Sequence, residues 1–216
     1  MTRLDRTGAA VAGAAALVIV ALALVLVGRG DETEAAARGG SYQKRFDALR
    51  EFGPGAEAGL SPIERERLSF RRLMMSHELA AAQGRAPGEA ERPEVHAYGR
   101  LELPSSGSVA MAAIGDSVCA WYVRGVGICG LPEQIETTGV AGSTRIGGGR
   151  WRVLAIVPEG VETVEADPDG DGAFAFRAPV RSGVYSGEFP GRSIRVRGLD
   201  RDGEVVFRDT VPLDRF

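Results

Sequence analysis

The chain of 216 residues contains no asparagine, one lysine, two histidines and two cysteines. Without asparagine there is no N-x-[ST] acceptor for N-glycosylation. Two histidines exclude a zinc site built from three histidines, and a Ser-His-Asp triad would have to use His77 or His96. Basic and acidic residues are nearly balanced, at 26 and 29, and no basic stripe is present. We therefore expect no nucleic-acid partner.

Several catalytic motifs are also missing. The sequence has no G-x-S-x-G, no H-E-x-x-H and no P-loop. Three consecutive glycines, Gly147 to Gly149, precede a predicted strand instead of a helix, so they do not form a phosphate cradle. We assign no catalytic residue and no cofactor, and an enzymatic function is the less favoured hypothesis.

The longest apolar run covers residues 9–27 and contains no charged or polar side chain. At ~1.5 Å per residue it would form a helix of roughly 28 Å, close to the ~30 Å hydrocarbon thickness of a bilayer. We predict a transmembrane helix over 9–28 and a short cytoplasmic tail over 1–8. The alternatives are a buried core helix, which would need a polar face, and a cleaved signal peptide, whose apolar core is usually only about 7–15 residues.

The orientation of this anchor follows from the rest of the chain. Long C-terminal domains are translocated largely regardless of charge, and paired cysteines suit an oxidising compartment. We therefore predict a single-pass protein of the cell membrane with its N-terminus in the cytoplasm and its C-terminal domain outside. The expected partners are the lipid bilayer, through residues 9–27, and an unknown extracytoplasmic protein or envelope ligand.

A juxtamembrane spacer and a helical stalk are predicted over residues 29–93. A first helix over 41–52 is indicated by Tyr42, Phe46 and Leu49, which recur at helical spacing. A second helix is predicted from Ser61, its N-cap, to about residue 83, because Pro62 suits the first turn and Glu64 completes a capping box.

The second helix has two apolar faces. Its residues divide into one stripe of Ile63, Phe70, Met74, His77 and Ala81 and another of Leu68, Met75, Leu79 and Ala82. We favour a helix that lies deep between the first helix and the following domain. The alternative is that one face contacts a partner or the membrane.

From residue 94 to 216 the apolar period changes from 3.6 to 2, which predicts an antiparallel β-sandwich or small barrel. The whole chain is thus of the α+β class. Residues 139–149 are predicted to form a long flexible loop. Strands are expected over 95–103, 108–114, 117–123, 126–129, 151–157, 161–166, 173–177, 184–189, 193–199 and 204–211.

The two cysteines lie on either side of a predicted hairpin. A three-residue loop over 123–125 would pair Tyr122 with Val126 and would place Cys119 opposite Cys129. Alternation puts this pair at a non-hydrogen-bonded position, where the Cα atoms approach most closely, and predicts a disulfide. The alternative is a pair of buried free thiols, because the spacing does not form a C-x-x-C redox motif.

A weak calcium motif follows. Asp167, Asp169 and Asp171 match the first half of a D-x-D-x-D-G loop, but Ala178 stands where the bidentate glutamate belongs. The flanking segments are predicted strands, not helices. An acidic hairpin turn is therefore the favoured interpretation, and calcium binding is the alternative.

Three further segments carry a resemblance. They are residues 46–50 (FDALR), the cysteine-bearing hairpin over 118–130, and residues 155–164 (AIVPEGVETV) with 177–189 (RAPVRSGVYSGEF). In these segments the chain resembles a group of membrane-anchored or secreted actinobacterial proteins that have no assigned activity. The resemblance implies an exported β domain and says nothing about catalysis.

Three functions are compatible with this organisation. We favour an extracytoplasmic binding, sensing or envelope-associated module, because the predicted cytoplasmic tail is too short for a signalling domain. The alternatives are an envelope hydrolase with its site near residues 139–149, and a calcium-binding, adhesin-like domain. A deep pocket with converging carboxylates would favour the hydrolase.

Overall fold

The computed structural model describes residue 42 and residues 44–86, 91–104, 107–122, 125–190 and 193–212. The predicted membrane anchor, residues 9–28, lies outside these ranges. None of the helices in the described ranges combines the length and the apolar character that a membrane span needs. The described residues from Tyr42 onward belong to one compact unit.

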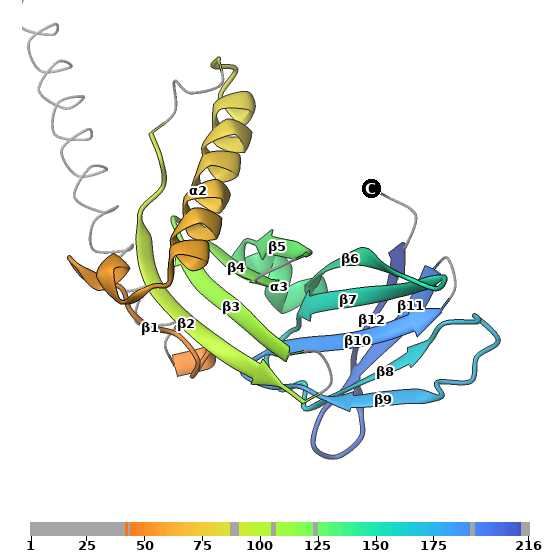
Figure 1. The fold of residues 1–216 in the computed structure, drawn as a ribbon. Helices are drawn as coiled ribbons and strands as arrows, with labels where there is room; N and C mark the ends of the chain where they lie inside the picture. The colour runs from red at the N-terminus through yellow and green to blue at the C-terminus, as the bar shows by residue number, and fades with distance from the viewer. Residues whose placement is uncertain are drawn as a thin grey trace, which may run out of the picture. The chain divides into compact units, whose positions relative to one another are not determined.

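Antiparallel β-sheet dominates this unit, as predicted (Figure 1). The first sheet has the order β1-β2-β3-β4-β5 and the bounds β1 Arg50–Glu51, β2 Val95–Leu103, β3 Gly107–Ile114, β4 Ser117–Tyr122 and β5 Gly127–Gly130. The second has the order β10-β7-β6, with β6 Val140–Gly147, β7 Arg150–Ile156 and β10 Val184–Pro190. The third has the order β12-β11-β8-β9, with β8 Thr163–Asp167, β9 Phe176–Pro179, β11 Ser193–Leu199 and β12 Val205–Pro212.

Strand β7 lies at the centre of the packing, because both of its faces are buried. Leu154 and Ile156 join a core that also contains the inward residues of the first sheet. Val153 and Ala155, on the opposite face, join a core shared with the third sheet. This explains why the second half of β7, residues 153–156, is a continuous apolar run in the sequence, instead of an alternating one. The second and third sheets thus face each other as a sandwich.

Helix α2, Pro62–Ala82, confirms the predicted second helix. Its N-cap is Ser61, and the Ser61 backbone N–H donates to the Glu64 carboxylate at 2.9 Å. The C-terminus ends at Gly84, which has a positive φ of 66°, while the Arg85 N–H donates to the Ala80 carbonyl at 2.8 Å. Both ends follow from the capping residues in the sequence.

The predicted first helix over residues 41–52 is wrong beyond its first turn. Helical backbone is found at residues 42, 44 and 45, whereas Arg50–Glu51 forms β1 and pairs with β2. The three apolar residues that suggested the helix are nevertheless buried: Tyr42, Phe46 and Leu49. Pairing with the edge of β2 replaces the helix, because residues 50–51 gain backbone hydrogen bonds to β2 while Phe46 and Leu49 stay buried.

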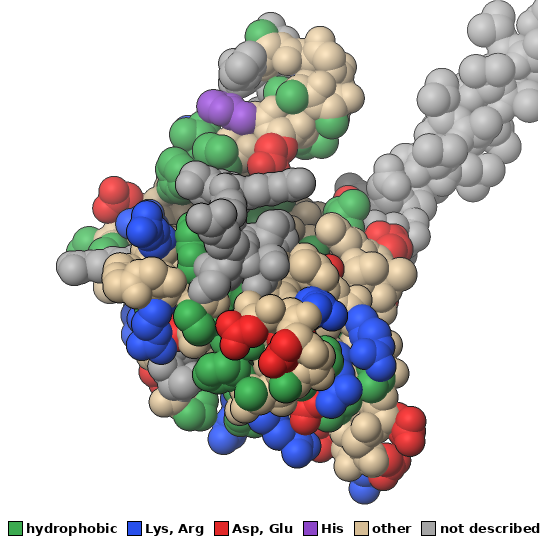
Figure 2. Space-filling model, turned by 90° about the vertical axis from the view of Figure 1, so that its right-hand side faces the viewer, with side chains coloured by type: hydrophobic (Ala, Val, Ile, Leu, Met, Phe, Trp, Pro, Cys, Tyr) green, Lys and Arg blue, Asp and Glu red, His purple; other side chains and the backbone are tan. Residues whose placement is uncertain are grey.

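The interpretation of α2 as a helix enclosed on two sides is also wrong. Leu68 and Met75 pack on the outer face of the first sheet. Phe70 and Met74, on the other stripe, remain 49 % and 38 % exposed. Without a full first helix there is no described element to cover that stripe. Hydrophobic side chains are visible on the surface of the projecting helix (Figure 2).

The predicted loop over residues 139–149 is wrong as well. Residues 140–147 form strand β6, which pairs with β7, and only Gly148 and Gly149 form a turn, both with positive φ. Helix α3, Pro132–Thr138, precedes this strand and buries Ile135. Short 3₁₀ helix η1, Ala56–Gly59, lies between β1 and α2.

Candidate functional site

The cysteine hairpin has the predicted register. Cys119 stands opposite Cys129 and Trp121 opposite Gly127. The two sulfur atoms are 2.05 Å apart and form a disulfide, with a Cα–Cα distance of 4.0 Å. The Tyr122 N–H donates to the Val126 carbonyl at 3.1 Å and closes the hairpin. Gly127 leaves space opposite Trp121, and a side chain of helix α2 fills it.

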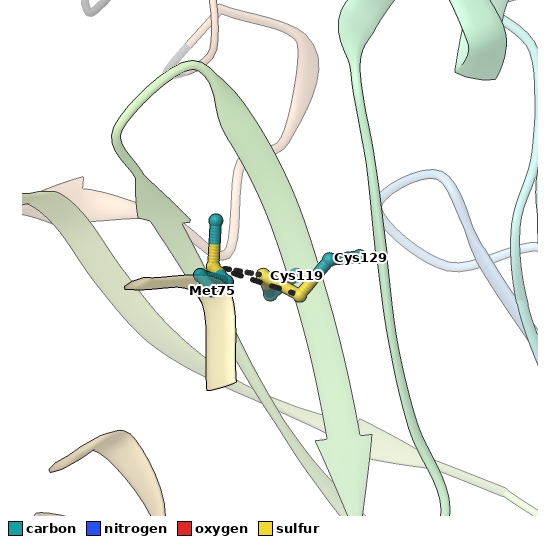
Figure 3. Close-up of a disulfide and its surroundings, with 3 residues drawn as sticks. All are labelled: Met75, Cys119 and Cys129. Carbon is teal, nitrogen blue, oxygen red and sulfur yellow. Dashed lines mark hydrogen bonds between the residues drawn. A yellow bond between two sulfur atoms is a disulfide. The ribbon is translucent and has the colours of Figure 1, made fainter. Parts of the chain in front are cut away.

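Helix α2 packs directly over this hairpin. The Met75 sulfur lies 3.7 Å from the Cys119 sulfur and 4.0 Å from the Cys129 sulfur (Figure 3). One turn earlier, the Arg71 guanidinium occupies the position that a Cβ atom at Gly127 would take. The hairpin therefore holds an arginine of the helix at its surface, and only glycine at position 127 allows this approach.

Arg71 belongs to an open groove of about 680 Å³ between α2, the tip of the β4–β5 hairpin and the β6–β7 hairpin. We call this the arginine groove. Two further cations, Arg67 from α2 and Arg145 from β6, line it. The remaining lining residues are Gly125, Val126, Gly127, Ser143, Thr144 and Trp151.

The electrostatics of the arginine groove are unbalanced. Among the residues that the structure describes, none forms an ion pair with Arg67, Arg71 or Arg145. Burial lowers the pKa of Arg71. The Glu78 carboxylate raises this pKa in part, and the neighbouring Arg67 cation lowers it. An arginine stays protonated through such a shift. The groove therefore concentrates positive charge that an anion would neutralise.

Several other arginines of the described part form ion pairs with carboxylates. Arg100 pairs with Glu64, Arg152 with Glu188, and Arg197 with Glu165. These pairs tie neighbouring elements together, as the Arg100–Glu64 pair does for β2 and α2. In the arginine groove, by contrast, the Glu78 carboxylate acts on Arg71 only electrostatically, and no described carboxylate forms an ion pair with Arg67, Arg71 or Arg145.

The Glu64 pair is part of a buried network. The Glu64 carboxylate accepts from the Tyr98 hydroxyl at 2.8 Å and from the Arg100 guanidinium. The Arg100 interaction, with hydrogen bonds from Ser61 and Tyr98, outweighs burial and lowers the pKa of Glu64 to about 2. Burial, assisted by the Glu64 charge, raises the pKa of Tyr98. The network is structural: it fixes the start of α2 on β2.

In the acidic turn, the first aspartate binds the backbone of the turn itself. The Asp167 carboxylate accepts from the N–H groups of Gly170 and Gly172 at 2.7 and 3.0 Å. Burial raises its pKa, but these bonds and Arg195 outweigh burial and lower it. Asp169 and Asp171 remain at the surface, and the Asp171 carboxylate accepts from Ala173. Within the described ranges, no three acidic, histidine or cysteine side chains converge as metal ligands.

The segment proposed for a hydrolase site forms most of strand β6. Residues 139–149 contain no carboxylate themselves, and Asp209 of β12 lines a small pocket together with Gly139, Val140 and Ala141. His77 lies half-buried on α2 and His96 half-buried on β2, and in the described part of the chain neither bonds to a carboxylate. The site that sequence reasoning missed is the arginine groove. Its members come from three separate segments, so no local motif could indicate it.

Comparison of the chain with protein-family models, curated proteins and solved structures found no match. The resemblance to exported actinobacterial proteins therefore stays a prediction.

Proposed function

We propose that this protein is a single-pass, membrane-anchored binding module whose extracytoplasmic β domain binds an anionic group of an envelope ligand in the arginine groove. The observation that carries the proposal is the set of three arginines, Arg67, Arg71 and Arg145, that line one groove, none of them in an ion pair within the described residues. The Glu78 carboxylate acts on Arg71 electrostatically but forms no ion pair with it. Arginine suits this role because its planar guanidinium binds carboxylate or phosphate oxygens in pairs.

The shape of the groove supports a ligand larger than a single inorganic ion. Its volume of about 680 Å³ falls in the range of roughly 300–1,000 Å³ typical of small-molecule sites. Trp151 offers a half-buried aromatic ring, and Thr144 a half-buried hydroxyl-bearing side chain. These groups would orient the neutral part of a ligand while the arginines hold its charge.

The membrane placement is the second part of the proposal. The uncharged run over 9–27 and the Cys119–Cys129 disulfide support it together, because disulfides persist in oxidising compartments. Labelling of intact cells with a reagent that cannot cross the bilayer tests this part. Modification of the β domain in intact cells is expected, and modification only after lysis would overturn the placement.

Anion binding is tested by calorimetric titration of the detergent-solubilised full chain with tripolyphosphate and, separately, citrate at constant ionic strength. We expect saturable binding to wild type. Arg71→Gln should weaken it about tenfold or more, because a hydrogen bond to a charged group is worth about 1.5–3 kcal/mol. Arg201→Gln removes the same charge from an exposed turn and serves as the matched control. Equal weakening by both variants would indicate non-specific charge attraction and would contradict the proposal.

A further inference from the structure

The exposed stripe of α2 has a pattern that is complementary to itself. At ~100° per residue, Phe70 and Met74 lie near the centre of the stripe and differ by only about 40° around the helix. Both side chains are exposed, at 49 % and 38 %. Leu68 and Met75, which pack on the first sheet, lie on the opposite side. Phe70 and Met74 therefore do not belong to the core that the described residues form.

Charged residues border this stripe on both sides. On one side lie Arg67 and Glu78, which differ by about 20° around the helix, and on the other lie Glu66 and His77, which also differ by about 20°. Glu66 and Glu78 are exposed, and Arg67 and His77 are half-buried. Each border therefore carries one cation or histidine and one carboxylate, at opposite ends of the helix.

We propose that α2 pairs in antiparallel fashion with α2 of a second copy of this chain. Antiparallel pairing about a two-fold axis near Arg72 places Phe70 against Met74 of the second copy, and the reverse. The same operation brings Arg67 beside Glu78 of the second copy and Glu66 beside His77 of the second copy. The midpoints of these three pairs coincide to within about half a residue, or ~0.8 Å along the helix.

This coincidence is what selects a second copy as the occupant. A parallel two-fold pair would set each border against the opposite border of the second copy, so Arg67 would lie beside Glu66 and Glu78 beside His77. Its centre, however, would place Phe70 on Phe70 and Met74 on Met74, without contacts between methionine and the aromatic ring. In the antiparallel pair, both borders are complementary and the centre gains two contacts between a methionine sulfur and an aromatic ring. A two-fold interface uses the same patch on both copies, as required here.

The expected dimer is weak. One pair of helices buries less than the roughly 1,200 Å² of a standard interface, so the dissociation constant should be micromolar or higher. Covalent trapping is therefore the suitable assay. The pairing also brings Arg67, which lines the arginine groove, close to a carboxylate of the second copy, so dimer formation and anion binding are expected to compete for that side chain.

The test uses the full chain in detergent, with single cysteines introduced in differently tagged copies. Mixing Phe70→Cys with Met74→Cys under mild oxidation should give several-fold more cross-linked dimer than either variant alone. Both positions are exposed, so the substitutions leave the core unchanged. Stronger cross-linking of Phe70→Cys alone would indicate a parallel pair, and background levels in all three samples would indicate no pairing through this stripe. Either result overturns the proposal.

Charge reversal supplies an independent test. Arg67→Glu and Glu78→Arg should each reduce the cross-linked fraction of the mixed sample about threefold or more, because like charges would then meet across the dimer. Combining both substitutions in every copy restores complementary pairs and should restore the yield. A double variant that cross-links no better than the single variants would contradict the proposed register.

Discussion

At the scale of single residues, two positions determine how α2 contacts the first sheet. Glu64 holds the first turn of the helix on β2 through Tyr98 and Arg100. Gly127 lets the Arg71 guanidinium lie on the cysteine hairpin, since any side chain there would overlap it. One position stabilises the fold and the other shapes the arginine groove, so substitutions at the two should have separable effects.

Glu64→Gln is expected to lower the free energy of unfolding at pH 7 by about 1–3 kcal/mol, because it weakens hydrogen bonds to a buried charged group. The wild-type Glu64 pKa of about 2 lies below its unfolded value. This stabilisation is therefore complete above about pH 4.5 and is lost as the pH falls towards 2. Urea unfolding at pH 7 and pH 3 measures the difference, which should shrink at the lower pH.

Exposed Glu66 provides the control for this prediction. Glu66→Gln should change the stability at pH 7 by about 0.5 kcal/mol or less, as is usual for surface substitutions. If Glu64→Gln behaved like Glu66→Gln at both pH values, the network around Glu64 would have no role in stability.

Gly127→Ala should reduce tripolyphosphate affinity severalfold, because the added Cβ displaces the Arg71 guanidinium from its place over the hairpin. Gly59→Ala is the matched control, since no atom lies within 4 Å of its Cβ position. Titration calorimetry checks both variants, and urea unfolding checks that each remains folded. Unchanged affinity in Gly127→Ala would show that the position of Arg71 is irrelevant to binding.

At the scale of elements, local signals determined what could be predicted. The cysteine hairpin was predicted with its register because the loop length and the alternation of two short strands fix it. The start and end of α2 were predictable because Ser61, Pro62 and Gly84 act through neighbouring backbone. The hairpin register and the ends of α2 are therefore both determined by residues close in sequence.

Strands β6 and β1 were missed because their formation depends on distant segments. Gly142 interrupts the alternation of β6, yet a Cβ atom there would lie 2.6 Å from Ile128 on β5. That glycine reflects close packing of two strands, not flexibility. Phe46 and Leu49 have helical spacing but pack into the core next to an edge strand that the local sequence cannot reveal.

Removing the disulfide should destabilise the protein without preventing folding. The bond joins residues separated by only 10 positions, so Cys119→Ala with Cys129→Ala should cost about 2–3 kcal/mol in the free energy of unfolding. Met75→Leu, which keeps apolar contact with the hairpin, should cost less than about 1.5 kcal/mol. Urea unfolding of wild type, the double-alanine variant and Met75→Leu distinguishes the contribution of the disulfide from that of Met75 packing. A double-alanine variant as stable as wild type would contradict a stabilising role of the disulfide.

At the scale of the whole molecule, the described unit is a β scaffold with one helix laid on its outer sheet. The doubly buried strand β7 joins two cores, and this strand begins beside the arginine groove at Trp151. The groove therefore lies on a rigid framework, which suits a binding site that must hold charges in fixed positions. Since the three arginines come from α2 and β6, only the folded chain brings them together.

Hydrogen–deuterium exchange of the full chain, with and without saturating tripolyphosphate, tests the central claim most directly because it locates the ligand. Binding in the arginine groove predicts added protection in the segments around Gly125–Gly127 and Ser143–Arg145. It also predicts that this protection disappears in Arg71→Gln. Protection confined to other segments, or equal protection in Arg71→Gln, would contradict the proposed anion site.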